Sequence, residues 1–486
     1  MEPTRLELLL HDVPHDVVGA LPSSEITGIC TDTRKLRPGD LFFALIGENT
    51  DGHSYVRQAL DSGATAAVVS LVPEDAGKGP LIVVADTLRA LGLAARNYRR
   101  RFQIPVIAIT GSVGKTSVRE MTAALLRTSY RTLASEKNFN NEIGVPLTLF
   151  ELSSEHEAAV IEMGMRGAGE IDWLAEIAEP AIGLITNIGH SHLERLGSRE
   201  GIASAKAEML ARLPADGVAI LPRQDDYFEF LKRQIKSGCR IITYSDSARD
   251  RPDVSVQVED GCPTVATGGQ KTSLNMDAMT PHTARNAAAA IAAGLALDIP
   301  VALAVNAFTG LKPVEGRLRP LRGKNWITVL DDCYNAAPES MATALEFLSA
   351  SHSVLGTGLP LPSECETLVY AKMRRVAVLG DMRELGEAAP ELHRVVGRQV
   401  VDAGVHLLIT VGELAGMIAQ EAERRAAEIG KPAPLHRAFA NSDEAATGIE
   451  FLLAPLDYIL VKGSRAMEME KIVAALTGEE GTSAHG

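Results

Sequence analysis

Cysteine and aromatic residues are scarce in this sequence, and neither group forms a recognisable pattern. The cysteines are odd in number and scattered along the chain, at positions Cys30, Cys239, Cys262, Cys333 and Cys365. No CxxC pair or Cys/His ligand spacing joins them, which excludes a disulfide framework and a thiolate zinc site. Aromatic residues make up 4% of the chain, with Trp173 and Trp326 as the only tryptophans. The core must therefore consist mainly of Ala, Val, Leu and Ile.

Long apolar runs and a basic charge balance are also lacking. No run of about 18 apolar residues occurs, so the sequence predicts no membrane insertion. The N-terminal stretch MEPTRLELLLHDVPHD is too polar for a signal peptide, and we expect a cytoplasmic protein with reduced thiols. The net charge of −14 argues against nucleic acid or anionic lipid as a partner, because both require a basic surface. A local basic cluster for a phosphorylated substrate stays compatible with this charge.

The 486 residues exceed what one hydrophobic core accommodates, and the apolar pattern predicts three α/β domains. The first is residues 1–86, a small α/β unit. Its expected strands are 40–47, 64–70 and 80–86, with a helix at 54–63. A helix at 88–102 is expected to lead into the second domain.

The second domain, residues 87–313, alternates short apolar strands with helices, which is typical of a mostly parallel sheet covered on both faces. Its expected strands are 106–110, 158–164, 181–188, 217–222 and 240–245. The expected helices include 114–128, 198–213 and 282–297, and residues 255–269 predict an antiparallel hairpin.

The third domain, residues 314–486, follows an interdomain linker at 311–320. Its expected strands are 326–331, 375–381, 406–412 and 457–463. A stretch rich in Ser, Gly and Pro at 349–368 predicts a loop insertion, and we expect the tail 478–486 to be disordered.

The sharpest chemical signal is VIAITGSVGKTS at 106–117, an apolar strand that ends in a glycine-rich turn opening into a helix. Gly111 and Gly114 would allow successive backbone N–H groups to face a phosphate at the positive end of the helix. Lys115 would reach the β- and γ-phosphates, and the Thr116 hydroxyl would bind Mg²⁺. Ile109 stands where the common phosphate-loop pattern has its first glycine. An ordinary strand–turn–helix connection is the alternative.

Acidic and imidazole groups follow neighbouring predicted strands. Glu162 ends one strand, and His190 and His192 follow the next one along the chain. Ligands of open α/β sheets collect at the carboxyl ends of the strands, so these groups are expected near Thr116. The alternative is a solvated glutamate with two surface histidines. Lys206 lies on a later helix, where the pattern alone indicates a solvated charge.

Seven ordered motifs resemble the Mur ligase family and span nearly the whole chain. They are TGSVGKTS (110–117), NFNNEIGVP (138–146), AVIEMGMRGAGEI (159–171), TNIGHSHLERLGSREGIASAKAEM (186–209), DDCYNAAPESM (331–341), VLGDMRELG (378–386) and LVKGSRAMEME (460–470). The resemblance implies a small N-terminal α/β domain for the UDP substrate, a central P-loop ATPase and a C-terminal Rossmann-like domain. It also implies ATP-dependent addition of D-alanyl-D-alanine to UDP-N-acetylmuramoyl-tripeptide through an acyl phosphate, by a chain that we expect to be a monomer.

The resemblance further implies which residues hold ATP and the metal. The ATP contacts would be Gly111, Ser112, Val113, Gly114, Lys115, Thr116, Ser117, Asn286 at the adenine, Arg317 at a phosphate and Asp332 at the ribose. Two Mg²⁺ ions would be held by Thr116, Glu162, His192 and a carbamate on Lys206. Lys115, Glu162, His192 and Lys206 would be the catalytic residues, and His190 only a neighbour.

The remaining motif residues are expected at the substrates. The UDP-sugar end would meet Thr31, Asp32, Arg34, Asn49 and His53, all from the motif TDTRKLRPGDLFFALIGENTDGHSYV (31–56). The peptide and dipeptide would meet Asn138, Asn141, Tyr334, Asn335, Asp381, Glu384, Lys462, Ser464 and Arg465.

Other functions stay open on the sequence. A folylpolyglutamate synthase or the Mur ligase that adds the third peptide residue is a neighbouring possibility, although a DNPR-type segment is lacking and GDMRELG favours dipeptide addition. A P-loop ATPase without ligase activity would leave the outer domains unexplained. A catalytically dead homologue is disfavoured because the chain retains all five of Lys115, Thr116, Glu162, His192 and Lys206. The sequence leaves lysine or diaminopimelate open at the third peptide position.

Overall fold

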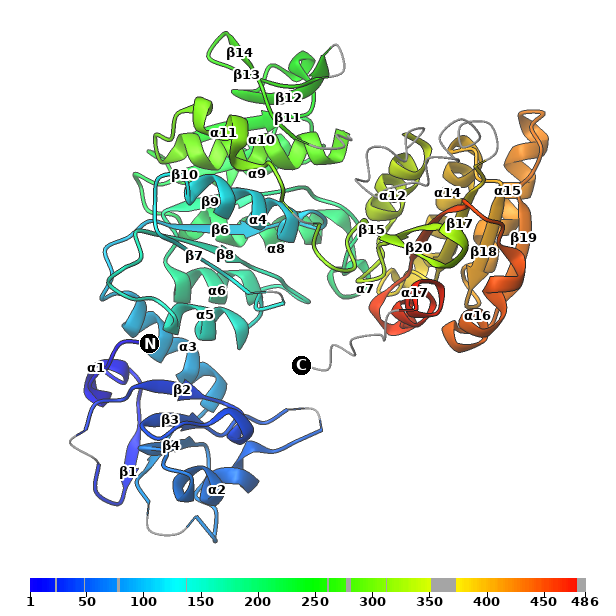
Figure 1. Cartoon of the computed structure of the whole chain (residues 1–486). Coiled ribbons are helices and arrows are strands. Elements are labelled where there is room, and N and C mark those ends of the chain that lie inside the picture. Colours follow the sequence, from blue (N-terminus) through cyan, green and yellow to red (C-terminus); the bar gives the residue numbers. More distant parts are fainter. Residues whose placement is uncertain are drawn as a thin grey trace.

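The computed structural model describes residues 1–21, 24–47, 49–76, 79–136, 138–259, 262–276, 281–311, 313–350 and 373–478. They form three lobes, each built on its own sheet (Figure 1). In Figure 1 the N-terminal lobe lies below the central lobe and the C-terminal lobe lies to its right. The three-domain α/β fold is thus confirmed, while the expected insertion at 349–368 and the tail lie almost wholly outside the described residues.

The N-terminal lobe contains a five-stranded sheet in the order β1-β5-β4-β3-β2. Strands β2 to β5 are parallel, and β1 is antiparallel to β5. Short runs of buried apolar residues such as Leu41–Phe43 explain these short strands. The elements are α1 (Leu6–Leu9), β1 (Asp16–Val18), β2 (Gly28–Cys30), η1 (Thr33–Lys35), β3 (Asp40–Phe43), η2 (Gly52–Tyr55), α2 (Val56–Asp61), β4 (Ala66–Val69) and β5 (Leu81–Val83).

The central lobe contains a nine-stranded sheet in the order β14-β13-β12-β11-β10-β9-β6-β8-β7. Strands β6 to β12 are parallel to their neighbours, and the predicted hairpin is β12–β13, extended by β14. The elements are α3 (Thr87–Arg99), β6 (Val106–Thr110), α4 (Lys115–Leu126), β7 (Thr132–Ala134), α5 (Gly144–Phe150), β8 (Ala158–Glu162), α6 (Glu170–Ala178), β9 (Ile182–Ile185), α7 (Leu193–Leu196), α8 (Arg199–Arg212), β10 (Val218–Pro222), α9 (Phe228–Arg233), β11 (Arg240–Ser245), η3 (Ala248–Asp250), β12 (Val254–Glu259), β13 (Cys262–Thr267), β14 (Gln270–Ser273), α10 (Pro281–Ala296) and α11 (Val301–Ala307).

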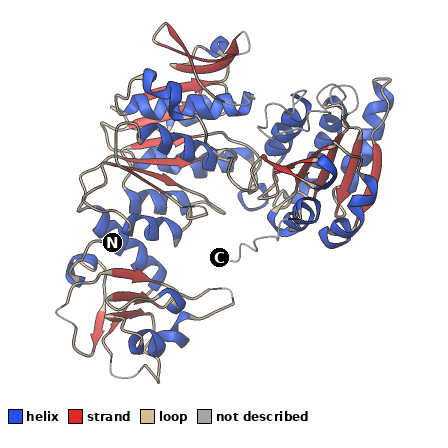
Figure 2. Cartoon of the chain, in the orientation of Figure 1, coloured by secondary structure: helices blue, strands red, loops and turns tan. Residues whose placement is uncertain are grey.

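The C-terminal lobe contains a six-stranded sheet in the order β15-β16-β20-β17-β18-β19. All pairs are parallel except β15–β16, so the lobe is a mostly parallel sheet with helices on both faces (Figure 2). The elements are β15 (Arg319–Arg322), η4 (Lys324–Trp326), β16 (Thr328–Asp331), α12 (Pro338–Ala350), β17 (Arg375–Gly380), η6 (Gly386–Ala388), α14 (Ala389–Asp402), β18 (Leu407–Val411), α15 (Gly416–Glu428), β19 (Leu435–Phe439), α16 (Ser442–Gly448), η7 (Ile449–Leu452), β20 (Tyr458–Lys462), η8 (Arg465–Met467) and α17 (Glu470–Thr477).

The linker differs from its prediction at one end. Residues 319 and 320 belong to the edge strand β15 and are not part of a free connection. An edge strand needs hydrogen bonds on one side only, so the polar and proline-containing sequence RPLR is compatible with it. The irregular part of the connection therefore ends before Arg319.

The apolar cores join the N-terminal lobe to the central lobe but leave the C-terminal lobe with cores of its own. One continuous core joins the N-terminal sheet, α3 and one face of the central sheet, and a second fills the other central face under α4 and α10. Two further cores lie on the two faces of the C-terminal sheet. Among the described residues, no apolar core joins the C-terminal sheet to the other two sheets. The N-terminal lobe is thus packed on the central lobe, whereas the C-terminal lobe is attached mainly through polar contacts and the linker.

The described helices include none that is both long and apolar enough to cross a membrane. The four described cysteines, Cys30, Cys239, Cys262 and Cys333, are free thiols, as the sequence predicted.

Tyr98 provides a test of how the first two lobes are joined. Its ring is fully buried, its hydroxyl donates to Leu152 O at 2.6 Å, and it accepts the Glu2 N–H at 2.8 Å. Tyr98→Phe leaves both backbone groups without this partner and should lower the unfolding free energy by about 1–3 kcal/mol. Tyr55→Phe, at a residue 40% exposed, is the matched control. Equal melting temperatures for the two variants would contradict the prediction.

Candidate active site

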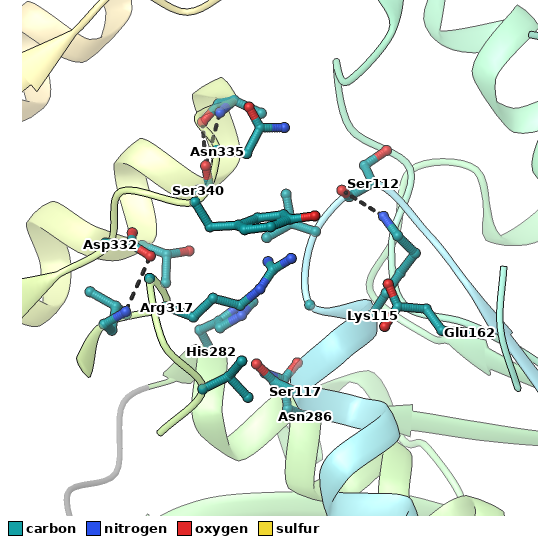
Figure 3. A pocket seen from close by; sticks show the side chains of 18 of the residues that line it. Ser112, Lys115, Ser117, Glu162, His282, Asn286, Arg317, Asp332, Asn335 and Ser340 are labelled. Atoms are coloured by element: carbon teal, nitrogen blue, oxygen red, sulfur yellow. Dashed lines mark hydrogen bonds between the residues drawn. The ribbon is translucent and has the colours of Figure 1, made fainter. Parts of the chain in front are cut away.

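A cavity of about 770 Å³ lies between the central lobe and the C-terminal lobe (Figure 3). Figure 3 shows Lys115 and Glu162 on the central-lobe side and Asp332 and Asn335 on the opposite side. Most of the predicted site residues line it: Ser112, Val113, Gly114, Lys115, Ser117, Asn141, Glu162, His192, Lys206, Asn286, Arg317, Asp332, Tyr334, Asn335 and Lys462. Sequence-distant motifs therefore converge on one chamber.

Strand order explains the convergence. The parallel strands β9, β6 and β8 are neighbours, and the loops that follow their carboxyl ends carry the histidines, the glycine-rich turn and Glu162. Carboxyl ends of parallel strands meet at one edge of a sheet, which is where ligands of such sheets bind. Thr116 lies in the first turn of α4 and is buried beneath the turn.

The glycine-rich turn is held in an unusual backbone conformation. Gly111 has φ of 148° and Gly114 has φ of 89°, and a Cβ on Gly111 would lie 1.8 Å from Thr186 Oγ1. Two N–H groups of the turn, those of Ser112 and Val113, do not contribute to the expected series that faces a phosphate. The Ser112 N–H donates to Asn187 O and the Val113 N–H to Asn187 Oδ1, because the turn packs against the loop after β9.

Lys115 folds over this turn. Its Nζ donates to Gly111 O at 2.7 Å and to Ser112 O at 3.4 Å. Burial lowers the pKa of Lys115 to about 8, with Glu162 opposing the shift and Arg317 adding to it. A half-buried ammonium that faces mainly carbonyl groups is a site where a phosphate would be favoured electrostatically.

Glu162 is a buried carboxylate at the end of β8. Its Oε1 accepts from Asn140 Nδ2 at 2.8 Å, and Arg119 Nη1 lies 3.5 Å from its Oε2. That Oε2 atom is buried and has no hydrogen-bond donor among the described residues. Asn140 was missed by the sequence analysis, which selected Asn138 and Asn141 from the same motif. Asn138 is exposed, and Asn141 caps α5 by accepting from Gly144 N.

Lys206 is 2% exposed, which overturns the solvated charge that its helix pattern indicated. None of the described residues forms an ion pair or hydrogen bond with its amine. Burial lowers the pKa of Lys206 well below its ordinary value, and the neighbouring Lys115 lowers it further. The amine is therefore neutral far more readily than that of an exposed lysine.

The two histidines both reach the C-terminal lobe. His190 Nδ1 lies 2.5 Å from Glu339 Oε1, which also accepts the His190 N–H. His192 Nδ1 lies 2.6 Å from Glu384 Oε2, and none of the described residues pairs with its Nε2. Glu339 was not selected from the sequence, because nothing in the spacing of α12 indicates a contact with another lobe.

The far side of the cavity is built by the linker and the C-terminal lobe. The Arg317 guanidinium lies 4.4 Å from the centre of the Tyr334 ring. Asp332 pairs with the buried Lys462 at 2.7 Å, and burial raises the pKa of this carboxyl although Lys462 opposes the shift. His282, which was also missed, lines the cavity beside Asn286 on α10, and burial lowers its pKa to about 4.

Several predicted substrate residues lie away from the cavity. Asp381 is buried and accepts the Ala415 N–H, Ser464 accepts the Arg383 N–H, and Arg465 pairs with Glu470. In this arrangement these side chains stabilise the loops after β17 and β20, and their contact with a substrate stays a prediction.

The predicted UDP-sugar residues lie in the N-terminal lobe, around η1 and η2. Asp32 pairs with the exposed Arg34, and Asn49 is exposed, whereas Thr31 is half-buried. His53 is buried, with Nδ1 at 2.7 Å from Asp51 Oδ1 and Nε2 accepting from Ser70 N at 2.9 Å. With both ring nitrogens engaged, His53 shapes its loop, so a direct substrate contact would have to involve the loop around it.

The donor set fits a magnesium ion held with a nucleotide. The described residues contain no group of three His, Cys, Asp or Glu side chains that could form a protein-only metal site. Mg²⁺ is commonly held by one or two carboxylates together with substrate phosphates. Glu162 Oε2, which accepts no hydrogen bond from the described residues, and the buried Thr116 in the first turn of α4 match that requirement.

Three family models match the chain. Residues 25–110 match "Mur ligase family, catalytic domain", residues 109–294 match "Mur ligase middle domain" and residues 364–465 match "Mur ligase, glutamate ligase domain".

Curated proteins with full-length similarity have one name in common. A UDP-N-acetylmuramoyl-tripeptide–D-alanyl-D-alanine ligase of Synechocystis sp. is 37% identical, covering 94% of this chain and 93% of that protein. The ligases of the same name from Bacillus subtilis and Escherichia coli are each 35% identical, covering 93% and 97% of those proteins and 93% and 96% of this chain.

Solved structures agree with this similarity. MurF from Acinetobacter baumannii superposes with a TM-score of 0.84 at 30% identity, covering 99% of this chain and 100% of that one. A MurF ligase from Thermotoga maritima, solved in complex with ADP, shares the fold with a TM-score of 0.76 at 23% identity, covering 93% of this chain and 97% of that one.

Gly189 offers a test of how the C-terminal lobe is held on the central lobe. A Cβ at this position would lie 2.6 Å from the Glu339 carboxyl carbon, so Gly189→Ala should displace Glu339 from His190. Because the His190–Glu339 pair would then no longer join the two lobes, we expect a larger radius of gyration by small-angle X-ray scattering. Gly416→Ala, where a Cβ meets nothing within 4 Å, is the control. Identical scattering of both variants would show that the His190–Glu339 pair does not hold the lobes.

Proposed function

The chain belongs to the Mur ligase family, and we propose that it joins D-alanyl-D-alanine to UDP-N-acetylmuramoyl-tripeptide, with conversion of ATP to ADP and phosphate. The observation that carries the proposal is the cavity in which the glycine-rich turn, Glu162 and Lys206 face the C-terminal lobe. The relatives that have this activity as their name match the chain over nearly its whole length.

The chemistry explains why a nucleotide site faces a peptide site. A free carboxylate does not form an amide usefully, because the leaving group would be hydroxide. The tripeptide carboxylate therefore attacks the γ-phosphorus of ATP, giving an acyl phosphate and ADP. The neutral amine of the dipeptide attacks the acyl carbon, and the tetrahedral intermediate releases phosphate as the amide forms.

Lys115 and the first turn of α4 would hold the phosphates. The first N–H groups of a helix have no intrahelical acceptor, and here they open into the cavity beside the Lys115 amine. These charges are fixed before the reaction, so they stabilise the transferring phosphoryl group without reorganisation. Arg317, across the cavity, would add a second cation.

Thr116, Glu162 and His192 would hold Mg²⁺. When bound, the ion neutralises phosphate charge and orients the reacting oxygens. Glu384 faces His192 Nδ1 and leaves Nε2 for the metal, which is the orientation that outer carboxylates give to metal-binding histidines. Asn140 and Arg119 hold Glu162 in place from the protein side.

Lys206 would carry a carbamate formed with CO₂. The neutral amine is the form that reacts with CO₂, and both burial and Lys115 favour that form. The carbamate would replace a buried amine that has no partner among the described residues with an anion beside Lys115 and the metal. A buried charge without a partner is costly, so the nearby cations are what would make this anion tolerable.

The other substrates would enter from the flanking lobes. Asn286 would meet the adenine and Asp332 the ribose, while Thr31, Asp32, Arg34, Asn49 and the His53 loop would hold the UDP end. Tyr334, Asn335 and Lys462 line the cavity where the dipeptide would approach. Asn138, Asn141, Asp381, Glu384, Ser464 and Arg465 complete the proposed peptide contacts.

Lobe closure would accompany the reaction. The connection contributes Leu311, Pro313, Val314, Gly316, Arg317 and Leu318 to the cavity wall, and among the described residues no apolar core fixes the C-terminal lobe to the central one. Rotation about this connection would exclude water, which otherwise hydrolyses an acyl phosphate. Every proposed contact comes from one chain, so a monomer suffices. Consumption of ATP is consistent with a cytoplasmic enzyme.

The direct test is phosphate release from Mg-ATP with UDP-N-acetylmuramoyl-tripeptide and a panel of amino acceptors, followed by product masses. We expect turnover only with both substrates present, preference for D-alanyl-D-alanine, and the mass of a pentapeptide product. Comparing tripeptides that end in lysine or diaminopimelate would identify the third residue. ATP hydrolysis without an acceptor, or glutamate addition to a folate, would overturn the proposal.

The carbamate has its own test. Lys206→Ala should lower kcat on the order of 100-fold, since it removes a group at the metal. With ¹³C-labelled bicarbonate, the unmodified chain should give a carbamate resonance by NMR that Lys206→Ala lacks. Lys271→Ala, at an exposed lysine paired with Glu259, should retain that resonance. An unchanged spectrum in Lys206→Ala would place the carbamate elsewhere or exclude it.

A further inference from the structure

The peptide bond between Val113 and Gly114 is held from the side opposite the cavity. The Val113 carbonyl accepts from Thr186 Oγ1 at 2.6 Å and from Asn187 Nδ2 at 3.0 Å. The same Asn187 side chain accepts the Val113 N–H through Oδ1 at 3.0 Å. Both donors lie directly after β9, on a different crossover of the sheet from the glycine-rich turn.

This anchoring fixes the direction of the next N–H group. The carbonyl and N–H of a trans peptide point in opposite directions, so the Gly114 N–H points away from Thr186 and Asn187. No acceptor among the described residues takes this N–H. It is therefore free for a ligand at the wall of the cavity that Gly114 lines.

Without the anchor, this peptide has a low-energy alternative. Gly114 has φ of 89°, and glycine tolerates both signs of φ, so rotation of the Val113–Gly114 peptide by half a turn meets little steric resistance. The rotated peptide would present the Val113 carbonyl oxygen to the cavity in place of the Gly114 N–H. A carbonyl dipole in that position would repel a phosphate.

Hydrogen bonds to the neighbouring residue, Ser112, strengthen this attachment of the turn. The Ser112 N–H donates to the Asn187 carbonyl, and Ser112 Oγ accepts the Gly189 N–H at 2.9 Å. Two consecutive residues of the turn are therefore fixed to the loop after β9. Within the turn, the N–H groups left for a phosphate are those from Gly114 onward.

We propose that Thr186 and Asn187 are positioning residues that lock the Val113–Gly114 peptide in the orientation that binds the nucleotide phosphates. They touch neither substrate nor reacting atoms and act only through the direction of the Gly114 N–H. The inference rests on the proposed nucleotide site and adds to it the element that keeps the site formed before ATP arrives.

Thr186→Val removes one donor to the Val113 carbonyl at nearly constant shape, and Thr186→Ser restores it. A hydrogen bond of this kind is worth about 1 kcal/mol, so Thr186→Val should weaken ADP binding about 5-fold and Asn187→Ala about 10-fold or more. Thr186→Ser should stay within about 2-fold of the unsubstituted chain on the same scale. Calorimetric titration with Mg-ADP measures the affinity directly.

Steady-state kinetics separate this role from general destabilisation. The KM for ATP should rise in Thr186→Val and Asn187→Ala, whereas the KM for D-alanyl-D-alanine should stay unchanged. The matched control is Asn97→Ala, which removes a buried asparagine whose Nδ2 donates to Leu9 O and Asp12 Oδ1 far from the turn. It should lower thermal stability but leave the KM for ATP unaltered.

The possible results separate failure of the lock from failure of the proposed function. ADP affinities of Thr186→Val and Thr186→Ser that agree within about 2-fold, or an equal rise of the ATP KM in Asn97→Ala, would overturn the lock. If Asn187→Ala does not fold, the comparison of ADP affinity between Thr186→Val and Thr186→Ser still tests the lock. If the unsubstituted chain binds no ADP and forms no pentapeptide, the proposed function fails, and the lock fails with it.

Discussion

The rest of this structure depends on two amines in one cavity, those of the buried Lys206 and the half-buried Lys115. Lys115 has carbonyl groups as hydrogen-bond acceptors, and Lys206 has no partner among the described residues. Burying an unpaired cation costs several kcal/mol, and a second cation beside it increases that cost. Burial lowers the pKa of both lysines, and a neighbouring cation adds to each shift: Arg317 for Lys115 and Lys115 for Lys206. A triphosphate at Lys115 and a carbamate on Lys206 would each place negative charge directly beside these amines.

Strand order brings the loops on the central-lobe side of this cavity together. Neighbouring parallel strands β9, β6 and β8 deliver the histidine loop, the glycine-rich turn and Glu162 to one edge of the sheet. Polar groups at that edge then hold one another in place. Asn187 accepts a hydrogen bond from the glycine-rich turn, and Asn140 donates one to the Glu162 carboxylate. The chemistry is therefore carried by short loops whose positions are set by a rigid apolar sheet, and only the C-terminal wall of the cavity depends on how the lobes are placed.

The helices and strands that depend on a local sequence pattern were predicted from the sequence. The run VIAIT and the glycines after it determine β6 and the start of α4, and both were placed correctly. The edge strand β15 was missed because its residues are polar and include a proline. Asn140, Asn187 and Glu339 were missed for another reason: their roles come from partners on other crossovers or another lobe. Lys206 had no pattern signal at all, since its burial depends on how α8 packs, and only the family resemblance selected it.

The contacts between the lobes connect domain position to the metal site. His192 belongs to the central lobe, but the carboxylate that faces its Nδ1 belongs to the C-terminal lobe. A carboxylate at one ring nitrogen increases the basicity of the other and fixes the direction of the ring. His190 is paired with Glu339 in the same way, and its loop is also bonded to the glycine-rich turn through Gly189 and Ser112. The loop after β9 therefore contacts the C-terminal lobe through His190 and His192 and the glycine-rich turn through Gly189, so rotation of that lobe would act on the proposed metal ligand and on the proposed phosphate turn through one loop.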